Sequence, residues 1–578
     1  MHPSKSVLSV RVLAAALVLG VGVATFAGPG KAHAVTRHRI GRHTALSVKT
    51  GVLRTAQDAD PPEVAIGERL FLETRFAQYF FAHQDGNVNH PLKAGDPVVA
   101  RLALSAGGSI PGPFAGQSMN CRGCHFVDDV AGQQTNTYGD YSRRSAVPAR
   151  TDGATRTARN APPLVDAQLE RDVPFFLHFD AEFATAEDLV ASTLTGRNFG
   201  WLAGERATAV AHIGRVVRED DGSDDLGRSY GGPLSVVLAG VDPGIPSDFL
   251  LPPAYRLDVA TAADEEILAG ISRLIAAYLR SLTFQQDDAG FFSGSPYDVF
   301  LVKNGLPRGP DPGESDRDYS RRLASAVSAL GDPAWVSDAD GSLAEHDQPF
   351  VFGPDELKGL KIFLREPPDG FDEDPRLSVA RSGNCAACHA APRFTDFGFH
   401  NTGVSQEEYD DIHGDGTFAR LFIPDLAARA AKPEVYLPPS SSRPQALGVF
   451  RQAPSVSRPG QADLGLWNVF ANPDIPVPQA GIPVALHMEG QGPDRILQAA
   501  IARFKTPTLR DLGQSAPYMH SGRKRELEDA VALYLTMSAR ARQGRVRNAA
   551  PELSAIFLTE DDVAPLAAFL RSLNEDYN

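Results

Sequence analysis

Three things are scarce in this sequence of 578 residues: cysteine, an excess of positive charge, and long apolar runs. The formal net charge is −15, which argues against nucleic-acid binding because phosphate contacts need clustered lysine and arginine. After the first 34 residues, no stretch approaches the ~20 apolar residues that a membrane-spanning helix needs. We therefore expect no nucleic-acid partner, and no membrane span in the mature chain.

The N-terminus has the pattern of an export signal. Lys5 and Arg11 lead into an apolar run over residues 12–28, and residues 32–34 form a small-x-small cleavage site. This predicts a signal peptide over residues 1–34 and a mature protein in the periplasm; an uncleaved membrane anchor is the alternative. Residues 35–60 are polar and basic without a helical or strand period, which predicts a flexible lead.

The four cysteines would ordinarily suggest two disulfides in an exported protein, but their spacing favours another chemistry. They form two Cys-x-x-Cys-His motifs, made of Cys121, Cys124 and His125, and of Cys385, Cys388 and His389. On a helical turn, positions i, i+3 and i+4 point the same way, so two thiols reach one macrocycle edge while the imidazole lies under the iron. The motif therefore predicts two covalent haem c groups. The alternative is a pair of redox Cys-x-x-Cys motifs that happen to precede histidine.

The chain also carries a weak internal repeat. Residues 276–282 (AAYLRSL) recur as residues 567–573 (AAFLRSL) at an offset of 291. Gly67 and Gly359 each precede a Phe-Leu pair by four positions, at an offset of 292, and the cysteine motifs repeat at an offset of 264. Each half thus reads opening helix, cysteine motif, closing helix, which indicates a duplication.

We predict a mainly α fold of two tandem cytochrome c-like haem domains with long loop-rich insertions. The first domain spans residues 61–290, a linker or insertion spans 291–352, and the second domain spans 353–578. Apolar residues at helical spacing predict a helix over residues 264–282, and Thr559 is the expected N-cap of the last helix. Proline- and glycine-rich residues 219–255, 304–352 and 405–500 are expected to be loops or small subdomains.

Four segments outside the cysteine motifs resemble the bacterial diheme cytochrome c peroxidase and MauG superfamily. They are residues 295–298 (SPYD), 392–404 (PRFTDFGFHNTGV), 504–522 (FKTPTLRDLGQSAPYMHSG) and 527–534 (LEDAVALY). The resemblance covers both cores and leaves the long insertions uncovered.

The resemblance implies a role for each haem: the first is peroxidatic and the second stores an oxidising equivalent. His125 and His389 fall on the proximal ligand positions. The second haem's sixth ligand is Met in the peroxidases and Tyr in the MauG branch, and Tyr534 occupies that position here. A tyrosine oxygen disfavours ferrous iron. A packed core aromatic is the plain alternative for Tyr534, and Met537 is the competing ligand.

Over the first haem, the resemblance points to an open or water-bound iron. Residues 126–159 contain no histidine, and Tyr141 stands where some peroxidases place one. Glu187 falls on the family's distal acid, which moves a proton during O–O cleavage; a solvated helix-start acid is the alternative reading. Leu177 replaces a frequent glutamine, and His178 is an alternative base.

Two further family features leave weaker traces. The tryptophan often placed between the haems is missing, and Val165 lies near its position. The family also binds one calcium ion through backbone carbonyls, and Ser515 and Pro517 match two of those positions.

These observations favour a periplasmic diheme c-type oxidoreductase. It would reduce hydrogen peroxide, or use it to oxidise a protein or small substrate, through high-valent haem iron. Its electrons would come from a small redox protein or from a protein substrate. The alternatives are a dioxygen-using oxygenase of the rubber-cleaving type, with an apolar pocket over the first haem, and a non-catalytic diheme electron carrier.

Overall fold

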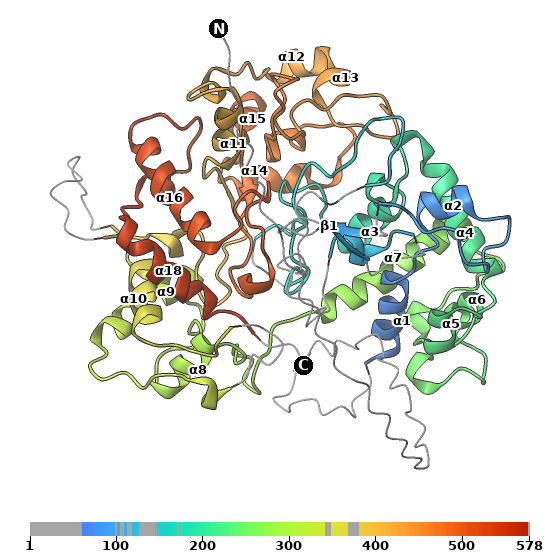
Figure 1. The fold of residues 1–578 in the computed structure, drawn as a ribbon, viewed down its shortest axis with the longest axis horizontal. Helices are drawn as coiled ribbons and strands as arrows, with labels where there is room; N and C mark the ends of the chain where they lie inside the picture. Colours follow the sequence, from blue (N-terminus) through green and yellow to red (C-terminus); the bar gives the residue numbers. More distant parts are fainter. Residues whose placement is uncertain are drawn as a thin grey trace, which may run out of the picture. The chain divides into compact units, whose positions relative to one another are not determined.

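The computed structural model describes residues 60–98, 101–103, 109–111, 118–125, 145, 147–169, 171, 173–341, 348–367 and 381–575. The predicted signal peptide, all but the last residue of the predicted lead, and Tyr141 lie outside these ranges. The described chain is mainly α-helical, as predicted (Figure 1). None of its helices is long and apolar enough to cross a membrane.

Helices account for most of the regular structure in both halves. The first half contains α1 (Pro62–Phe71), α2 (Gln78–His83), α3 (Ala186–Leu194), α4 (Arg206–Glu219), α5 (Asp225–Ser229), α6 (Leu234–Ala239) and α7 (Asp264–Ser281). The second contains α8 (Pro296–Lys303), α9 (Asp316–Ala329), α10 (Pro354–Leu364), α16 (Leu527–Arg542), α17 (Pro551–Ser554) and α18 (Val563–Arg571).

The segment between α10 and α16 is not a plain loop. It holds α11 (Val404–His413), α12 (Leu426–Ala431), α13 (Pro433–Tyr436), α14 (Gly481–Ala485) and α15 (Pro493–Ala499). Two antiparallel strand pairs complete the described structure, β1 (Arg101–Ala103) with β2 (Ser109–Pro111) and β3 (Phe399–His400) with β4 (Phe504–Lys505). The expected insertion at residues 405–500 is thus a helical subdomain.

The opening and closing helices of the first half cross at a glycine. The predicted helix over 264–282 forms as α7, and the Glu266 carboxylate accepts a hydrogen bond from the Ala263 N–H at its start. α1 lies against α7 (Figure 1). A Cβ at Gly67 would clash with the carbonyl oxygen of Leu274 and lie 2.9 Å from Tyr278 Cβ. The two helices are therefore too close for any side chain at residue 67.

The second half repeats this crossing. α10 packs on α18, and a Cβ at Gly359 would clash with the carbonyl oxygen of Pro565 and lie 2.7 Å from Phe569 Cβ. Pro565 and Phe569 each stand 291 positions after the residues that meet Gly67, which is the offset of the sequence repeat. The contact geometry confirms that the two halves share one helix arrangement. Thr559 caps the short 3-10 turn Glu560–Asp562 that leads into α18.

The two halves and the inserted subdomain each have an apolar core of their own. Trp201 is fully buried in the first core, and its indole N–H donates to the Phe76 carbonyl at 3.2 Å. Trp467 is fully buried in the core of the insertion, where the Arg429 guanidinium lies 4.7 Å from its ring centroid. Because Phe176 of the first half also belongs to the insertion's core, the insertion is packed onto the first half.

Gly359→Val should destabilise the protein by about 2 kcal/mol, because the added methyl groups force α10 away from α18. The midpoint of thermal unfolding, followed by circular dichroism at 222 nm, measures this. Gly331→Ala is the matched control, since a Cβ there meets nothing within 4 Å. Equal midpoints for the two variants would show that the crossing is looser than described.

Candidate functional site

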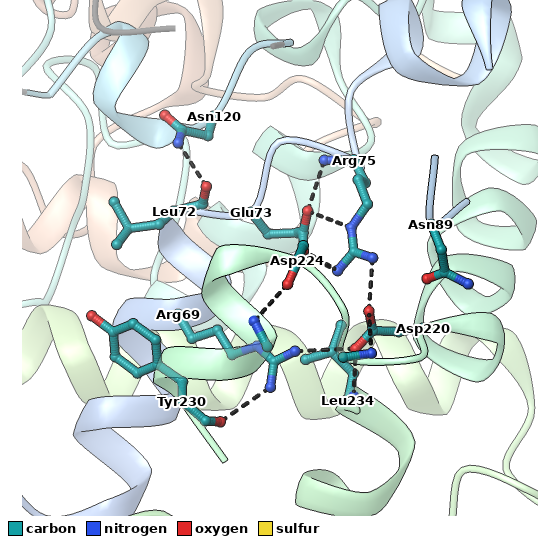
Figure 2. Close-up of polar contacts among 12 residues, drawn as sticks. Arg69, Leu72, Glu73, Arg75, Asn89, Asn120, Asp220, Asp224, Tyr230 and Leu234 are labelled. Atoms are coloured by element: carbon teal, nitrogen blue, oxygen red, sulfur yellow. Dashed lines mark hydrogen bonds and ion pairs between the residues drawn. The ribbon is translucent and has the colours of Figure 1, made fainter. Parts of the chain in front are cut away.

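The first Cys-x-x-Cys-His motif forms a compact turn. Cys121–Gly123 is a single 3-10 turn, and the His125 N–H donates to the Cys121 carbonyl at 3.0 Å. Asn120 caps the turn, since its Oδ1 accepts from the Arg122 N–H at 2.9 Å. Its Nδ2 donates to the Leu72 carbonyl at 2.7 Å, which ties the turn to the end of α1 (Figure 2). The two thiols and the imidazole thus project from one anchored turn.

A buried ion network fixes the end of α1 to which this turn is tied (Figure 2). Arg69 is fully buried and pairs with Asp220 at 3.0 Å, while Arg75 pairs with the other oxygen of Asp220 at 2.7 Å. The Glu73 carboxylate pairs with Arg75 at 2.6 Å. Burial alone would raise the pKa of Glu73, but the Arg75 guanidinium holds it below its ordinary value. The Glu73 carboxylate therefore stays charged, and the network holds the end of α1 in a fixed position under the motif.

The second motif repeats the arrangement with a different cap. Cys385–Ala387 is again a 3-10 turn, and the His389 N–H donates to the Cys385 carbonyl at 2.8 Å. Asn384 adopts a left-handed conformation (φ 48°), and its Nδ2 donates to the Glu552 carbonyl at 3.1 Å. Asn120 and Asn384 were missed in the sequence. The signal was present, because they share the 264-residue offset of the cysteines.

The second imidazole is oriented for ligation through its other nitrogen. His389 Nδ1 lies 3.0 Å from the Phe394 carbonyl oxygen, so that a proton on Nδ1 is held there and Nε2 stays available as an acceptor. Burial lowers the pKa of His389, which favours the neutral, ligating form.

The sulfur atoms fit a covalent porphyrin better than a disulfide pair. The four cysteines form no disulfide with one another. Burial, with a smaller contribution from the neighbouring thiol, raises the pKa of Cys121 and of Cys385 to about 12. A redox Cys-x-x-Cys motif needs a thiolate stabilised by its surroundings, whereas these surroundings disfavour one.

Tyr534 lies in the electrostatic neighbourhood of the second motif. Burial raises the pKa of the Tyr534 phenol, and the Cys388 and Cys385 thiols raise it further. Met537, one helical turn later on α16, is fully buried, and its side chain packs against Gly403. The Tyr534 side chain therefore lies near the two cysteines of the second motif.

His400, which the sequence analysis did not single out, lies beside the Cys388 sulfur. His400 on β3 lies 2.8 Å from Asp396 Oδ2 through Nε2 and 3.6 Å from Glu552 Oε2 through Nδ1. Burial would lower the pKa of His400, but hydrogen bonds with Asp396, Cys388 and Glu552 raise it to about 12. His400 is thus a cation held between two carboxylates at the edge of the second motif.

A narrow cleft of about 60 Å³, partly open to solvent, lies between the two halves. Its walls are residues 162–169, 177–179, 186, 189 and 279 of the first half and residues 393, 395, 397 and 505–508 of the second. Val165, near the position of the family's tryptophan, is among them, as are Leu177 and His178.

Arg171, which stacks on Phe397 of the cleft wall, has donors without a partner among the described residues. Its guanidinium is stacked between the rings of Phe175 and Phe397, 4.1 Å from each centroid. Its Nε and Nη1 are buried and have no hydrogen-bond partner among the described residues. Burial lowers the pKa of Lys505 to about 7, and the charge of Arg171 adds to this. Buried cations without an anion fit a carboxylate-bearing ligand, and the propionates of haem are such carboxylates.

The two candidate proton-transfer groups occupy different settings. Glu187, in the first turn of α3, forms an ion pair with Arg280, and both side chains are about one third or more exposed. His178 lines the cleft, has a left-handed backbone (φ 62°), and lies 3.0 Å from Glu182 Oε2 through Nδ1. A carboxylate at Nδ1 fixes the tautomer and the orientation of an imidazole.

The loop that carries His178 is clamped by the inserted subdomain. Arg451 forms an ion pair with Glu182, and Arg159 pairs with Asp180 at 2.6 Å and with Asp463 at 2.6 Å. Burial alone would raise the pKa of Glu182, but the Arg451 guanidinium, with His178, holds it well below its ordinary value. Arg451 and Asp463 lie in the insertion, so this segment helps to set the wall of the cleft.

Of the two residues predicted to bind calcium, Pro517 lies next to an amide. Asn160 Nδ2 donates to the Pro517 carbonyl at 2.6 Å, and the Ser515 hydroxyl donates to the Asp511 carbonyl at 2.8 Å. Asn160 Oδ1 is buried and has no hydrogen-bond partner among the described residues. An unsatisfied amide oxygen beside backbone carbonyls is compatible with a hard cation.

Comparison with known proteins yields only distant matches. No protein-family profile and no curated protein matches the chain. The diheme peroxidase BthA from Burkholderia thailandensis E264 is 18% identical with a TM-score of 0.42, over 90% of this chain and 87% of that chain. A MauG-like protein associated with microbial copper homeostasis is 16% identical with a TM-score of 0.38, over 90% of this chain and 91% of that chain. Both likenesses are low, so the function rests on this chain's own residues.

Replacing Cys385 and Cys388 together by alanine should leave one covalent haem in place of two. The measurement is the mass of the denatured, acid-extracted chain, which should fall by one haem group relative to the wild type. Ala387→Ser, which changes the same turn without removing a sulfur, should keep both. A wild-type chain that releases all its pigment into the acid extract would contradict the assignment.

Proposed function

We propose that the chain is a periplasmic diheme c-type oxidoreductase that reduces hydrogen peroxide, or uses it to oxidise a protein or small substrate. One observation supports this above all: each half carries a Cys-x-x-Cys-His turn hydrogen-bonded to the end of an opening helix, and each opening helix crosses a closing helix at a glycine. Haem held there supplies one-electron chemistry, and the reduction balances as H₂O₂ + 2 e⁻ + 2 H⁺ → 2 H₂O. A small redox protein, or an oxidisable protein substrate, is the proposed electron donor.

In this proposal each ligating residue has a defined task. Cys121, Cys124, Cys385 and Cys388 tether the two groups, and His125 and His389 hold the two irons from the proximal side. Tyr534 is the sixth ligand of the second. Its phenolate would favour ferric over ferrous iron, and its place near the cysteines of the second motif supports the assignment.

Two side chains remain candidates for moving protons at the first haem. Glu187 is the acid that the resemblance selects, but it is engaged by Arg280. His178 lines the cleft and has a carboxylate at Nδ1, so its Nε2 can accept a proton and return it. We propose His178 as the better placed group. Ser515 and Pro517 are proposed to offer carbonyl oxygens to one calcium ion, with Asn160 Oδ1 beside them.

One observation favours a second candidate, a dioxygen-using oxygenase. Leu177 replaces a polar residue in the cleft wall and is buried next to Phe183, whose carbonyl accepts its N–H at 2.8 Å. Together with Leu189 and Leu279, it makes part of the wall apolar. A stable complex with dioxygen and no reaction with peroxide would select this candidate.

Tyr534→Phe should convert the low-spin ferric signal of the second haem into a high-spin one, because the proposed oxygen ligand is removed. Electron paramagnetic resonance of the purified protein, before and after stoichiometric peroxide, measures it. Met537→Leu is the control and should keep the low-spin signal. If the two variants behave the other way round, Met537 is the ligand. Two low-spin haems without any peroxide reaction in the wild type would indicate an electron carrier.

Arg171→Leu should lower the reduction potential of one haem, by an amount on the order of tens of millivolts, because a buried positive charge no longer stabilises the reduced state. Spectroelectrochemical titration measures the potential without any turnover. Arg495→Leu, a change on the exposed start of α15, should leave both potentials unchanged. Unchanged potentials in Arg171→Leu would mean that its free donors do not face a haem.

A further inference from the structure

A groove of about 360 Å³ runs along α10 on the second half, away from the cleft between the halves. Its lining combines cations with apolar side chains, chiefly Trp335, Leu357, Lys358, Lys361, Arg365 and Arg381. Trp335 is 40% exposed, which is high for the largest apolar side chain. An exposed indole within a ring of cations is the composition of a contact surface rather than of a solvated face.

The positive charge of this groove is not neutralised from within. Lys358, Lys361 and Arg365 follow one another at intervals of three and four, so they share one face of α10 and its C-terminal end. None of the three has a carboxylate at ion-pair distance among the described residues, whereas Arg381 pairs with Asp562 at 3.1 Å. In a chain of net charge −15, this is a local reversal of sign.

The neighbouring acids are engaged elsewhere. Glu356 Oε2 accepts from the Gly353 N–H at 2.7 Å at the start of α10. Glu366 pairs with Arg321 at 3.0 Å and with Arg317 at 3.2 Å on α9. Neither of these carboxylates, nor any other among the described residues, lines the groove, so an approaching molecule meets its cations first.

The floor of the groove is bonded directly to the second cysteine turn. The Arg365 carbonyl accepts from the Asn384 N–H at 3.0 Å and from the Ser382 hydroxyl at 2.8 Å. The Ile362 carbonyl accepts from the Gly383 N–H at 3.0 Å. The end of α10 and the following Arg365 are therefore bonded to the residues that lead into Cys385, and Lys361 and Arg365 at this end also line the groove.

We propose that this groove docks an acidic one-electron carrier protein that delivers electrons to the second haem. The inference rests on the proposed function, because it assigns the donor of that site. Carboxylates around the carrier's redox centre would meet Lys358, Lys361 and Arg365, and an apolar contact would cover Trp335. Each encounter oxidises one carrier by one electron, so two encounters supply the two electrons that one hydrogen peroxide takes up with two protons.

The test uses the full, haem-loaded protein with two probes of opposite charge: reduced plastocyanin, an acidic copper carrier, and mitochondrial cytochrome c, a basic haem carrier. At low ionic strength the wild type should oxidise plastocyanin faster than cytochrome c in the presence of peroxide, and added salt should slow it. The triple variant Lys358→Glu, Lys361→Glu, Arg365→Glu should lose at least about tenfold of the plastocyanin rate. Turnover with a small uncharged reductant should not change.

The matched control reverses three exposed cations of the insertion, Arg420, Lys432 and Arg458, and should keep the plastocyanin rate. Docking is overturned if the α10 variant keeps that rate, if the control loses as much, or if cytochrome c is the faster donor. A wild-type protein that consumes hydrogen peroxide without any added reductant would contradict the proposed function rather than the docking proposal. Carbodiimide cross-linking then decides docking by itself: plastocyanin carboxylates joined to Lys358 or Lys361, mapped by mass spectrometry, support it, and their absence contradicts it.

Discussion

Two close helix crossings determine where the chemistry of this chain can take place. At Gly67 and at Gly359, backbone meets backbone, and the opening helix of each half is fixed against the closing one. The residue after each opening helix then offers its carbonyl to the asparagine that precedes a cysteine motif: Leu72 to Asn120 and Arg365 to Asn384. The crossings thereby position the tethering turns, through the Asn120 side chain in the first half and the Asn384 N–H in the second.

The halves share this framework, yet their surroundings differ. Under the first turn, the end of α1 is held by a buried network of arginines and carboxylates centred on Asp220 (Figure 2). Beside the second turn, His400 lies between Asp396 and Glu552, and Tyr534 projects from α16. Since reduction potentials follow nearby charge and axial donors, two equal scaffolds would yield two unequal sites. The insertion adds to the difference, because Arg451 and Asp463 clamp only the first half's loop.

The features that could be predicted from the sequence are those that short, specific residue patterns encode. The cysteine motifs, the duplicated helix pair and the span of α7 are local, and the structure places them as expected. The insertion's fold could not be foreseen, because its core around Trp467 gathers apolar residues scattered among prolines and glycines. Arg171 gave no signal, since stacking on Phe175 and Phe397 arises only after folding. Tyr534, Glu187, Ser515 and Pro517 remain predictions about ligands and protons.

The placement of the three tryptophans gives the molecule a built-in set of optical reporters. Trp201 and Trp467 are fully buried in different cores, and Trp335 is exposed at the groove along α10. Indole emission moves to longer wavelength when water reaches the ring, so loosening of one core alone would shift one emitter and leave the others in place. Fluorescence of chains that keep a single tryptophan could therefore separate the melting of the insertion from that of the half on which it is packed.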